Sequence, residues 1–288
     1  MITAGVIGWP VAHSKSPLIH RFWLAKLGID GDYSRFAVAP ENLGEVVRSL
    51  PKLGLAGVNV TVPHKVAVMK ELDRIDEQSL RAGAVNTVVV EQGGQLAGFN
   101  TDIAGVAEPL MALGRLVRPY PNHVATYVQI VGAGGAARAA VAGACIAGYG
   151  DFDVFARSTE KALPVAQMAG TPFGIATPLA ALGPIRNPGD GPDDQRYSHV
   201  VINATTMGMA GNEPVPIELN EYYPDTIVFD MVYAPLETPL LAAARARGLR
   251  TIDGLQMLVA QAAAAFALFY GQPAPREHDA ELRALLTA

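Results

Sequence analysis

The feature that most constrains the fold is a glycine-rich turn in residues 130–140, IVGAGGAARAA. An apolar, strand-like run precedes the turn, and a helical pattern rich in small residues follows it. Gly132, Gly134 and Gly135, with Ala137 in the third small position, allow a tight turn and a close approach of backbone N–H groups to a pyrophosphate. The turn therefore predicts a βαβ unit that binds a dinucleotide. The candidate cofactor-binding residues in it are Gly132, Ala133, Gly134, Gly135 and Ala136.

The end of the next predicted strand, DFDVFARSTEK, indicates which dinucleotide binds. A site for NAD would place an acidic residue here to bind the ribose hydroxyl groups. This strand instead ends at Ala156 and is followed by Arg157, Ser158 and Lys161. Two cations and a hydroxyl group can hold a 2′-phosphate, whereas a carboxylate would repel it. These residues favour NADP, with the alternative that the two cations are only solvated loop residues.

Short strand-like runs alternate with helical patterns along most of the chain. This alternation is typical of an α/β fold with a mainly parallel sheet. The first series consists of predicted strands at 4–8, 33–39 and 57–62, and of helical patterns at 17–28 and 40–54.

A second βαβ series begins near residue 124, and its later strands are expected at 199–205 and 225–232. Between the two series, residues 86–102 predict two strands joined by a turn at Gly93 and Gly94. A proline-containing break, RPYPN at 118–122, is suited to a domain junction. Residues 183–198 are rich in Gly, Pro and Asp, which indicates a surface loop.

Composition excludes several classes of protein. Half of the 288 residues are hydrophobic and 17% are charged, which predicts a globular chain with a sizeable core. The net charge of −5 gives no basic surface, so nucleic acid is not an expected partner. The single cysteine, Cys145, cannot form an internal disulfide and suits a reducing compartment. The N-terminus has no secretory pattern, and the longest apolar segment is too short to cross a bilayer. We therefore expect a cytoplasmic protein without a membrane partner.

Four short segments place polar groups at the ends of predicted strands and in turns. Each segment alone could serve turn formation or helix capping. Together they supply hydroxyl groups, amides, one lysine and one carboxylate, a set that suits a small polyhydroxylated substrate. The segments are HSKSP with Ser14 and Ser16, NVTVPHK with Asn59, Thr61 and Lys65, GAVNT with Asn86, and FNTD with Asn100, Thr101 and Asp102. Within NVTVPHK, Asn59 is expected to support the end of the strand.

With the glycine turn and the later segments NATTMGM, DMVYAP and DGLQMLVAQ, these motifs resemble the shikimate dehydrogenase family. The resemblance covers nearly the whole chain, and the motifs occur in the family's order. It implies a substrate domain formed by residues 1–103 and 256–288, and a Rossmann-like NADP-binding domain formed by 104–255. It also implies reversible reduction of 3-dehydroshikimate to shikimate.

The resemblance also implies roles for individual residues. Lys65 and Asp102 would be the catalytic pair, and Ser14 and Ser16 would hold the substrate carboxylate. Further substrate contacts would come from Thr61, Asn86, Tyr233 and Gln261, and further NADP contacts from Thr205, Met231 and Gly254. The chemistry agrees, because hydride transfer to a ketone gives the oxygen alkoxide character that an ammonium group can stabilise. Which member of the pair carries the proton is left open.

The sequence leaves alternatives open for the cofactor, the substrate and the oligomeric state. The family usually has Asn-Arg-Thr where this chain has Ala156, Arg157 and Ser158, which weakens the expectation of strict NADP use. A quinate or quinate/shikimate dehydrogenase using NAD is one alternative, and a non-catalytic sensor of a shikimate-like ligand is another. His13 and His64 do not form a helical pair with a carboxylate, so no metal site is predicted. A monomer and a homodimer are both compatible with the sequence.

Overall fold

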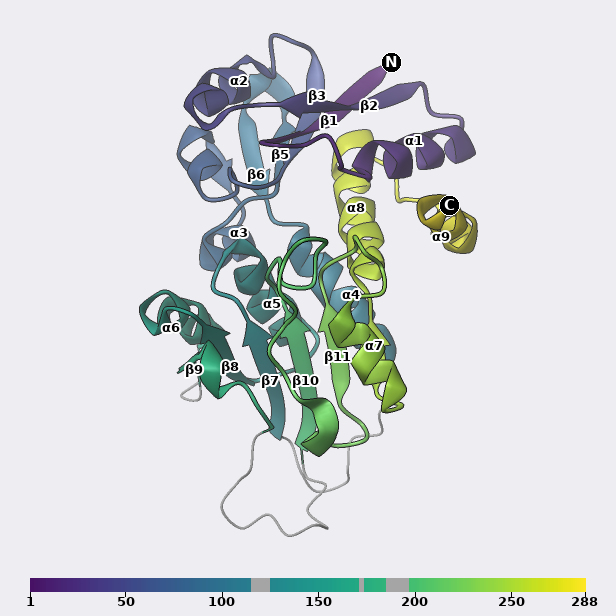
Figure 1. The fold of residues 1–288 in the computed structure, drawn as a ribbon. Coiled ribbons are helices and arrows are strands. Elements are labelled where there is room, and N and C mark those ends of the chain that lie inside the picture. The colour runs from purple at the N-terminus through teal and green to yellow at the C-terminus, as the bar shows by residue number, and fades with distance from the viewer. Residues whose placement is uncertain (115–124, 171–173, 185–196) are drawn as a thin grey trace. The chain divides into compact units, whose positions relative to one another are not determined.

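The computed structural model describes residues 1–114, 125–170, 174–184 and 197–288. The chain divides into two compact units, the first formed by Met1–Ala104 and Leu258–Ala288 and the second by Gly105–Met257 (Figure 1). The predicted substrate domain (1–103 and 256–288) and NADP-binding domain (104–255) are defined by their ligands, and their assignment to these two units stays a prediction. The predicted junction at 118–122 lies outside the described residues.

The first unit contains a mixed six-stranded sheet with the order β2-β1-β3-β5-β6-β4. Strand β1 is parallel to β2 and β3, whereas β5 is antiparallel to both β3 and β6. The short strand β4 is parallel to β6. The strands are β1 (Ile2–Gly8), β2 (Gly31–Ala37), β3 (Leu55–Val60), β4 (Arg74–Ile75), β5 (Thr87–Val90) and β6 (Leu96–Phe99).

The helices of the first unit include segments from both ends of the chain. Trp23 of α1 packs edge-on against Phe266 of α8, with ring centroids 5.5 Å apart. Lys26 of α1 forms an ion pair with Glu281 of α9 at 2.7 Å. The C-terminal helices therefore complete the unit that the N-terminal strands begin. The α-helices are α1 (Ser16–Leu27), α2 (Leu43–Ser49), α3 (Glu77–Ala82), α9 (Asp279–Thr287) and the residues from Leu258 onward of α8 (Gly254–Tyr270).

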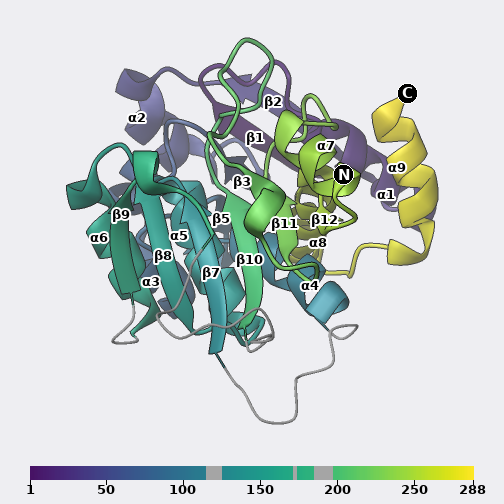
Figure 2. The ribbon, with the colours of Figure 1, turned by 60° about the horizontal axis from the view of Figure 1, so that its bottom comes forward.

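The second unit is built on a six-stranded sheet with the order β12-β11-β10-β7-β8-β9, and every pairing in it is parallel (Figure 2). Its strands are β7 (Ala125–Val131), β8 (Asp151–Ala156), β9 (Gly174–Pro178), β10 (Tyr197–Asn203), β11 (Ile227–Asp230) and β12 (Arg250–Ile252). Its helices are α4 (Asp102–Gly114), of which Gly105 onward lies in this unit, α5 (Gly135–Ile146), α6 (Thr159–Ala166), α7 (Pro239–Ala246) and the start of α8.

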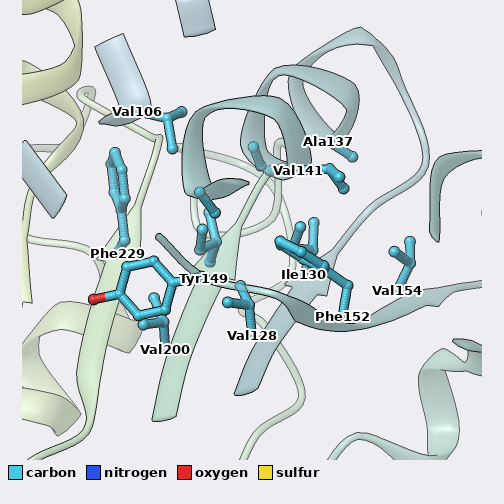
Figure 3. Packing of buried hydrophobic residues seen from close by; sticks show 14 of the residues in the cluster. Val106, Val128, Ile130, Ala137, Val141, Tyr149, Phe152, Val154, Val200 and Phe229 are labelled. Atoms are coloured by element: carbon cyan, nitrogen blue, oxygen red, sulfur yellow. The ribbon is translucent and has the colours of Figure 1, made fainter. Parts of the chain in front are cut away.

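A parallel sheet is stable when both faces are covered, so its strands are apolar on both sides. Ile130 of β7, Phe152 of β8 and Phe229 of β11 are buried in one cluster of the second unit (Figure 3). Val106 of α4 and Val141 of α5 join the same cluster. Helices α4 and α5 thus cover one of the two apolar faces of this sheet.

The mixed α/β class with mainly parallel strands is confirmed, whereas some strand boundaries are wrong. The predicted strand at 199–205 is β10, which begins at Tyr197, so residues 197–198 are not part of a loop. Most of that predicted loop, 185–196, lies outside the described residues. Strands β4, β9 and β12 were not predicted, and β4 and β12 have only two and three residues, too few to show a period. Among the described helices, none is long and apolar enough to cross a membrane.

Candidate functional site

Lys65 and Asp102 form an ion pair within the first unit. Strand β3 ends at Val60, and a turn closed by the His64 N–H bond to the Thr61 carbonyl leads to Lys65. Asp102 follows β6 and is the first residue of α4. The Lys65 Nζ atom lies 2.5 Å from Asp102 Oδ2, and the two side chains are 21% and 8% exposed. The structure therefore brings the two predicted catalytic residues together in a partly water-shielded contact.

Asn86 is held in a buried network of hydroxyl and amide groups. Its Oδ1 atom accepts hydrogen bonds from the Thr101 N–H at 2.7 Å, the Thr101 hydroxyl at 3.1 Å and the Thr87 hydroxyl at 2.9 Å. These contacts fix the orientation of the Asn86 amide and do not use its Nδ2 group as a donor. Because Thr101 adjoins Asp102, the network also links Asn86 to the ion pair of Lys65 and Asp102.

Asn59 extends this network, and its contacts agree with the prediction that it supports the end of its strand. The Asn59 Nδ2 group donates to the Thr87 hydroxyl at 2.9 Å, and Asn59 Oδ1 accepts from the Tyr33 hydroxyl at 2.6 Å. Tyr33 and Thr87 were not selected from the sequence. They become neighbours of Asn59 because β2 and β3 both pair with β1, and β3 also pairs with β5.

Ser14 and Ser16 lie together at the start of α1. The Ser14 hydroxyl donates to the Ser16 hydroxyl at 3.2 Å, and the Ser16 N–H donates to Ser14 Oγ at 3.3 Å. Pro17 occupies the first turn of the helix, where a missing N–H costs nothing. Two hydroxyl groups are therefore presented at one helix N-terminus.

The other predicted substrate residues are Thr61, Gln261 and Tyr233. Thr61 is half-buried, and its N–H donates to the Ile7 carbonyl at 2.9 Å. Gln261 on α8 is buried and donates to the Leu258 carbonyl at 2.9 Å. Both lie in the first unit, whereas Tyr233 lies in the second. Their contact with a substrate stays a prediction.

In the second unit, the glycine turn joins β7 to α5. Gly132 has φ +121°, a region that L side chains rarely adopt, and a Cβ there would lie 2.9 Å from Thr205 Cγ2. The first intrahelical bond runs from the Arg138 N–H to the Gly134 carbonyl at 3.1 Å. The N–H groups of the first turn, including those of Gly135 and Ala136, thus have no partner within this helix. Space around a Cβ at Gly134 is open to 4 Å. The turn fits a pyrophosphate group.

The end of β8 lies beside the glycine turn, because β7 and β8 are paired in parallel. Ala156 is buried, and Arg157 and Lys161 are exposed. Ser158 is the N-cap of α6, and its Oγ atom accepts the Lys161 N–H at 3.3 Å. As an acceptor in this contact, the hydroxyl group keeps its own proton for donation. One cation and one hydroxyl group thus stand at a helix N-terminus that can hold a phosphate.

Thr205 and Met231 are held by a buried polar cluster at the ends of β10 and β11. The Thr205 hydroxyl donates to Asn203 Oδ1 at 2.7 Å, and the Met231 N–H donates to the Asn203 carbonyl at 3.1 Å. Asn203 Nδ2 donates to Asp230 Oδ1 at 2.9 Å. Burial raises the pKa of Asp230, while hydrogen bonds from Thr238, the Val232 N–H and Asn203 oppose that rise.

Asn203 and Asp230 were not selected from the sequence, although polar residues that end apolar strands are a signal that could have found them. Gly254 closes the same region at the start of α8. A Cβ at this position would lie 2.4 Å from the Val232 carbonyl oxygen. In the described part of the chain, no three His, Cys, Asp or Glu side chains are arranged to hold a metal ion.

Comparison with known proteins identifies the family. Residues 6–88 match the model of the shikimate dehydrogenase substrate binding domain, and residues 254–281 match that of the shikimate 5′-dehydrogenase C-terminal domain. The NADP(+) shikimate dehydrogenase of Paramagnetospirillum magneticum is 43% identical over 98% of this chain and 97% of its own length. The chain belongs to the shikimate dehydrogenase family.

Two solved structures are similar to this chain over almost its whole length. One is a shikimate 5-dehydrogenase from Thermus thermophilus in complex with NADP(H) and shikimate, with a TM-score of 0.82, 33% identity and 99% of each chain covered. The other is a quinate dehydrogenase from Corynebacterium glutamicum in complex with NAD, with a TM-score of 0.81, 29% identity and 99% of each chain covered. The predicted fold and family are therefore confirmed.

Proposed function

We propose that this member of the family catalyses the reversible NADPH-dependent reduction of 3-dehydroshikimate to shikimate, a step of aromatic amino-acid biosynthesis. The observation that carries the proposal is the contact between Lys65 and Asp102, joined through Thr101 to the ordered amide of Asn86. The curated relative at 43% identity is named as the NADP(+) enzyme, which supports the same activity.

The bound NADPH would supply the hydride for the ketone carbon. As the carbonyl oxygen gains negative charge, the Lys65 ammonium group would stabilise it and stand within reach to protonate it. Asp102 orients that ammonium through the 2.5 Å contact and can accept a hydrogen bond from the reacting hydroxyl group in the reverse direction. Asn86 would donate to a ring hydroxyl, and Ser14 and Ser16 would hold the carboxylate with their hydroxyl groups.

The second unit fits NADP at two places. The first turn of α5 offers backbone N–H groups to the pyrophosphate, and the open space at Gly134 permits its approach. Arg157 and the Ser158 hydroxyl would hold the 2′-phosphate at the N-terminus of α6. Thr205, Met231 and Gly254 complete the proposed cofactor set, together with Ala156 and Lys161 beside the 2′-phosphate.

A quinate dehydrogenase using NAD is the second candidate, because the Corynebacterium structure matches as much of the chain and Ala156 replaces the family's usual Asn. Steady-state rates with shikimate and with quinate, each with NADP and with NAD, decide between the two. We expect the highest kcat/KM for shikimate with NADP. A higher kcat/KM for quinate with NAD would refute the proposal. A cytoplasmic location and a monomeric or homodimeric state stay predictions from the sequence.

A further inference from the structure

Arg35 contacts the turn that contains Ser14 and Ser16. Its Nε and Nη2 atoms both donate to the Ser14 carbonyl oxygen, at 2.9 and 2.5 Å. The hydroxyl group of the same serine donates to the Ser16 hydroxyl at 3.2 Å. The guanidinium group is therefore fixed to the residue that begins the proposed carboxylate site.

The position of Arg35 follows from strand β2. Side chains two residues apart in a strand lie on the same face, so Tyr33 and Arg35 point to the same side of the sheet. Burial raises the pKa of Tyr33, and a hydrogen bond with the Ser16 side chain opposes that rise. One face of β2 thus contacts both serines, with Tyr33 at Ser16 and Arg35 at Ser14.

Three other cations of the first unit already have partners. Lys15 Nζ donates to the Leu286 carbonyl, Lys65 pairs with Asp102, and Arg21 pairs with Asp32. No carboxylate lies within ion-pair distance of Arg35 in the part of the chain that the structure describes. A single carbonyl uses two of its five N–H groups and leaves its charge uncompensated.

We propose that Arg35 selects substrates that carry a carboxylate group, by fixing the Ser14 backbone and by supplying the positive charge that the two neutral hydroxyl groups lack. This inference rests on the proposed function. A carboxylate that leaves water needs a charged partner as well as hydrogen-bond donors. Because the Arg35 side chain is exposed, water and salt reduce the strength of its interaction.

The test compares Arg35→Gln and Arg35→Lys with Arg21→Gln, which makes the same change of net charge at another exposed arginine of the first unit. For Arg35→Gln we expect the KM for shikimate to rise about five- to tenfold, with kcat changed less than about twofold. Arg35→Lys keeps the charge and should recover most of the affinity. Arg21→Gln should match the parent, and the KM for NADP and the melting temperature should stay unchanged in all three variants.

Two further measurements identify the carboxylate as the target. Added NaCl should raise the KM for shikimate in the parent, because salt screens the attraction between Arg35 and the substrate carboxylate. In Arg35→Gln, where this attraction is absent, the same salt should raise the KM less. For shikimate methyl ester, which has the ring without the charge, the loss of kcat/KM in Arg35→Gln should be clearly smaller than the loss for shikimate, because only the hold on the Ser14 backbone is removed.

Three results would overturn the inference. They are an unchanged KM for shikimate in Arg35→Gln, an equal loss in Arg35→Lys and Arg35→Gln, and an equal loss with the acid and its ester. A parent enzyme that does not oxidise shikimate would instead refute the proposed function. The two failures are therefore distinguishable.

Discussion

At the scale of single residues, the contact between Lys65 and Asp102 supports the proposal that these two residues are catalytic. An exposed lysine would be free to move, whereas here Asp102 holds the ammonium group 2.5 Å away in a position with limited exposure. A fixed ammonium group can stabilise the developing charge on a ketone oxygen without first having to be ordered.

We expect Lys65→Ala to reduce kcat by about two to four orders of magnitude, the usual contribution of a positioned proton donor. Shikimate should still bind, because the serines and Asn86 remain. Stopped-flow turnover and calorimetric titration with shikimate measure the two effects separately. Lys70→Ala is the matched control, since Lys70 is an exposed lysine five residues further along the chain. Unchanged turnover in Lys65→Ala would remove Lys65 from the mechanism.

His20 has no role in the proposed reaction, but its burial changes its pKa and therefore the pH dependence of stability. Its ring is fully buried, is stacked on Tyr33 with centroids 4.1 Å apart, and lies edge-on to Trp23. Within the described residues neither ring nitrogen has a hydrogen-bond partner. Burial lowers the pKa of His20 from 6.5 to about 3. The folded protein therefore keeps this ring neutral at pH values where the unfolded chain would protonate it.

This difference predicts an acid-sensitive contribution to stability. The contribution is complete above pH 6.5 and is lost as the pH falls from 6.5 toward about 3, because only the unfolded state binds the proton. The loss amounts to at most about 1.4 kcal/mol per pH unit. Urea unfolding of the parent and of His20→Phe between pH 4.5 and 7.5 measures it, and we expect the advantage of the parent to shrink toward acid. Parallel pH profiles would contradict the prediction.

At the scale of secondary-structure elements, the glycines between β7 and α5 have separate tasks. Gly132 has a positive φ and no room for a Cβ beside Thr205 and the Ala204 carbonyl. Gly134 has φ −91°, and a Cβ there would meet open space. The first glycine is needed to fold the turn, and the second keeps open the space that the cofactor would use.

Paired alanine substitutions should separate these tasks. Gly132→Ala should lower the free energy of unfolding by about 1–3 kcal/mol, because the residue must adopt a strained backbone. Gly134→Ala should change it by less than about 0.5 kcal/mol. It should nevertheless weaken NADPH binding about tenfold or more, because the methyl group obstructs the pyrophosphate. Chemical unfolding and NADPH fluorescence titration measure the two effects, and the reverse pattern would refute the assignment.

The elements also show what the sequence can predict. The long strands and the hairpin at Gly93 and Gly94 were found because apolar alternation and turn residues are local signals. The pairing of Lys65 with Asp102 was suggested by motifs that occur in a known order. The contacts of Arg35 with Ser14 and of Tyr33 with Asn59 could not be predicted, because they join residues more than twenty positions apart and depend on how the strands pair.

At the scale of the whole molecule, the two units differ in how the chain builds them. The second unit is a continuous segment, and its core includes Val106 of α4 and Met257 of α8. The first unit needs both ends of the chain, because Phe266 of α8 fills the aromatic cluster around Trp23 and His20. A continuous segment with its own core is the usual condition for independent folding.

We therefore expect residues 102–257, which keep α4 whole, to fold alone and to bind NADPH within about tenfold, or about 1.4 kcal/mol, of the complete chain. Residues 1–104 alone should stay unfolded, because Trp23 and His20 would lose the aromatic rings of α8. Circular dichroism and NADPH titration test both fragments, and fluorescence of Trp9 and Trp23 tests the 1–104 fragment, which contains both tryptophans of the chain. A folded 1–104 fragment would contradict the prediction that the first unit needs α8. A 102–257 fragment without a cooperative unfolding transition would contradict the prediction that the second unit folds alone. Neither fragment should oxidise shikimate, since one lacks the cofactor turn and the other lacks Lys65.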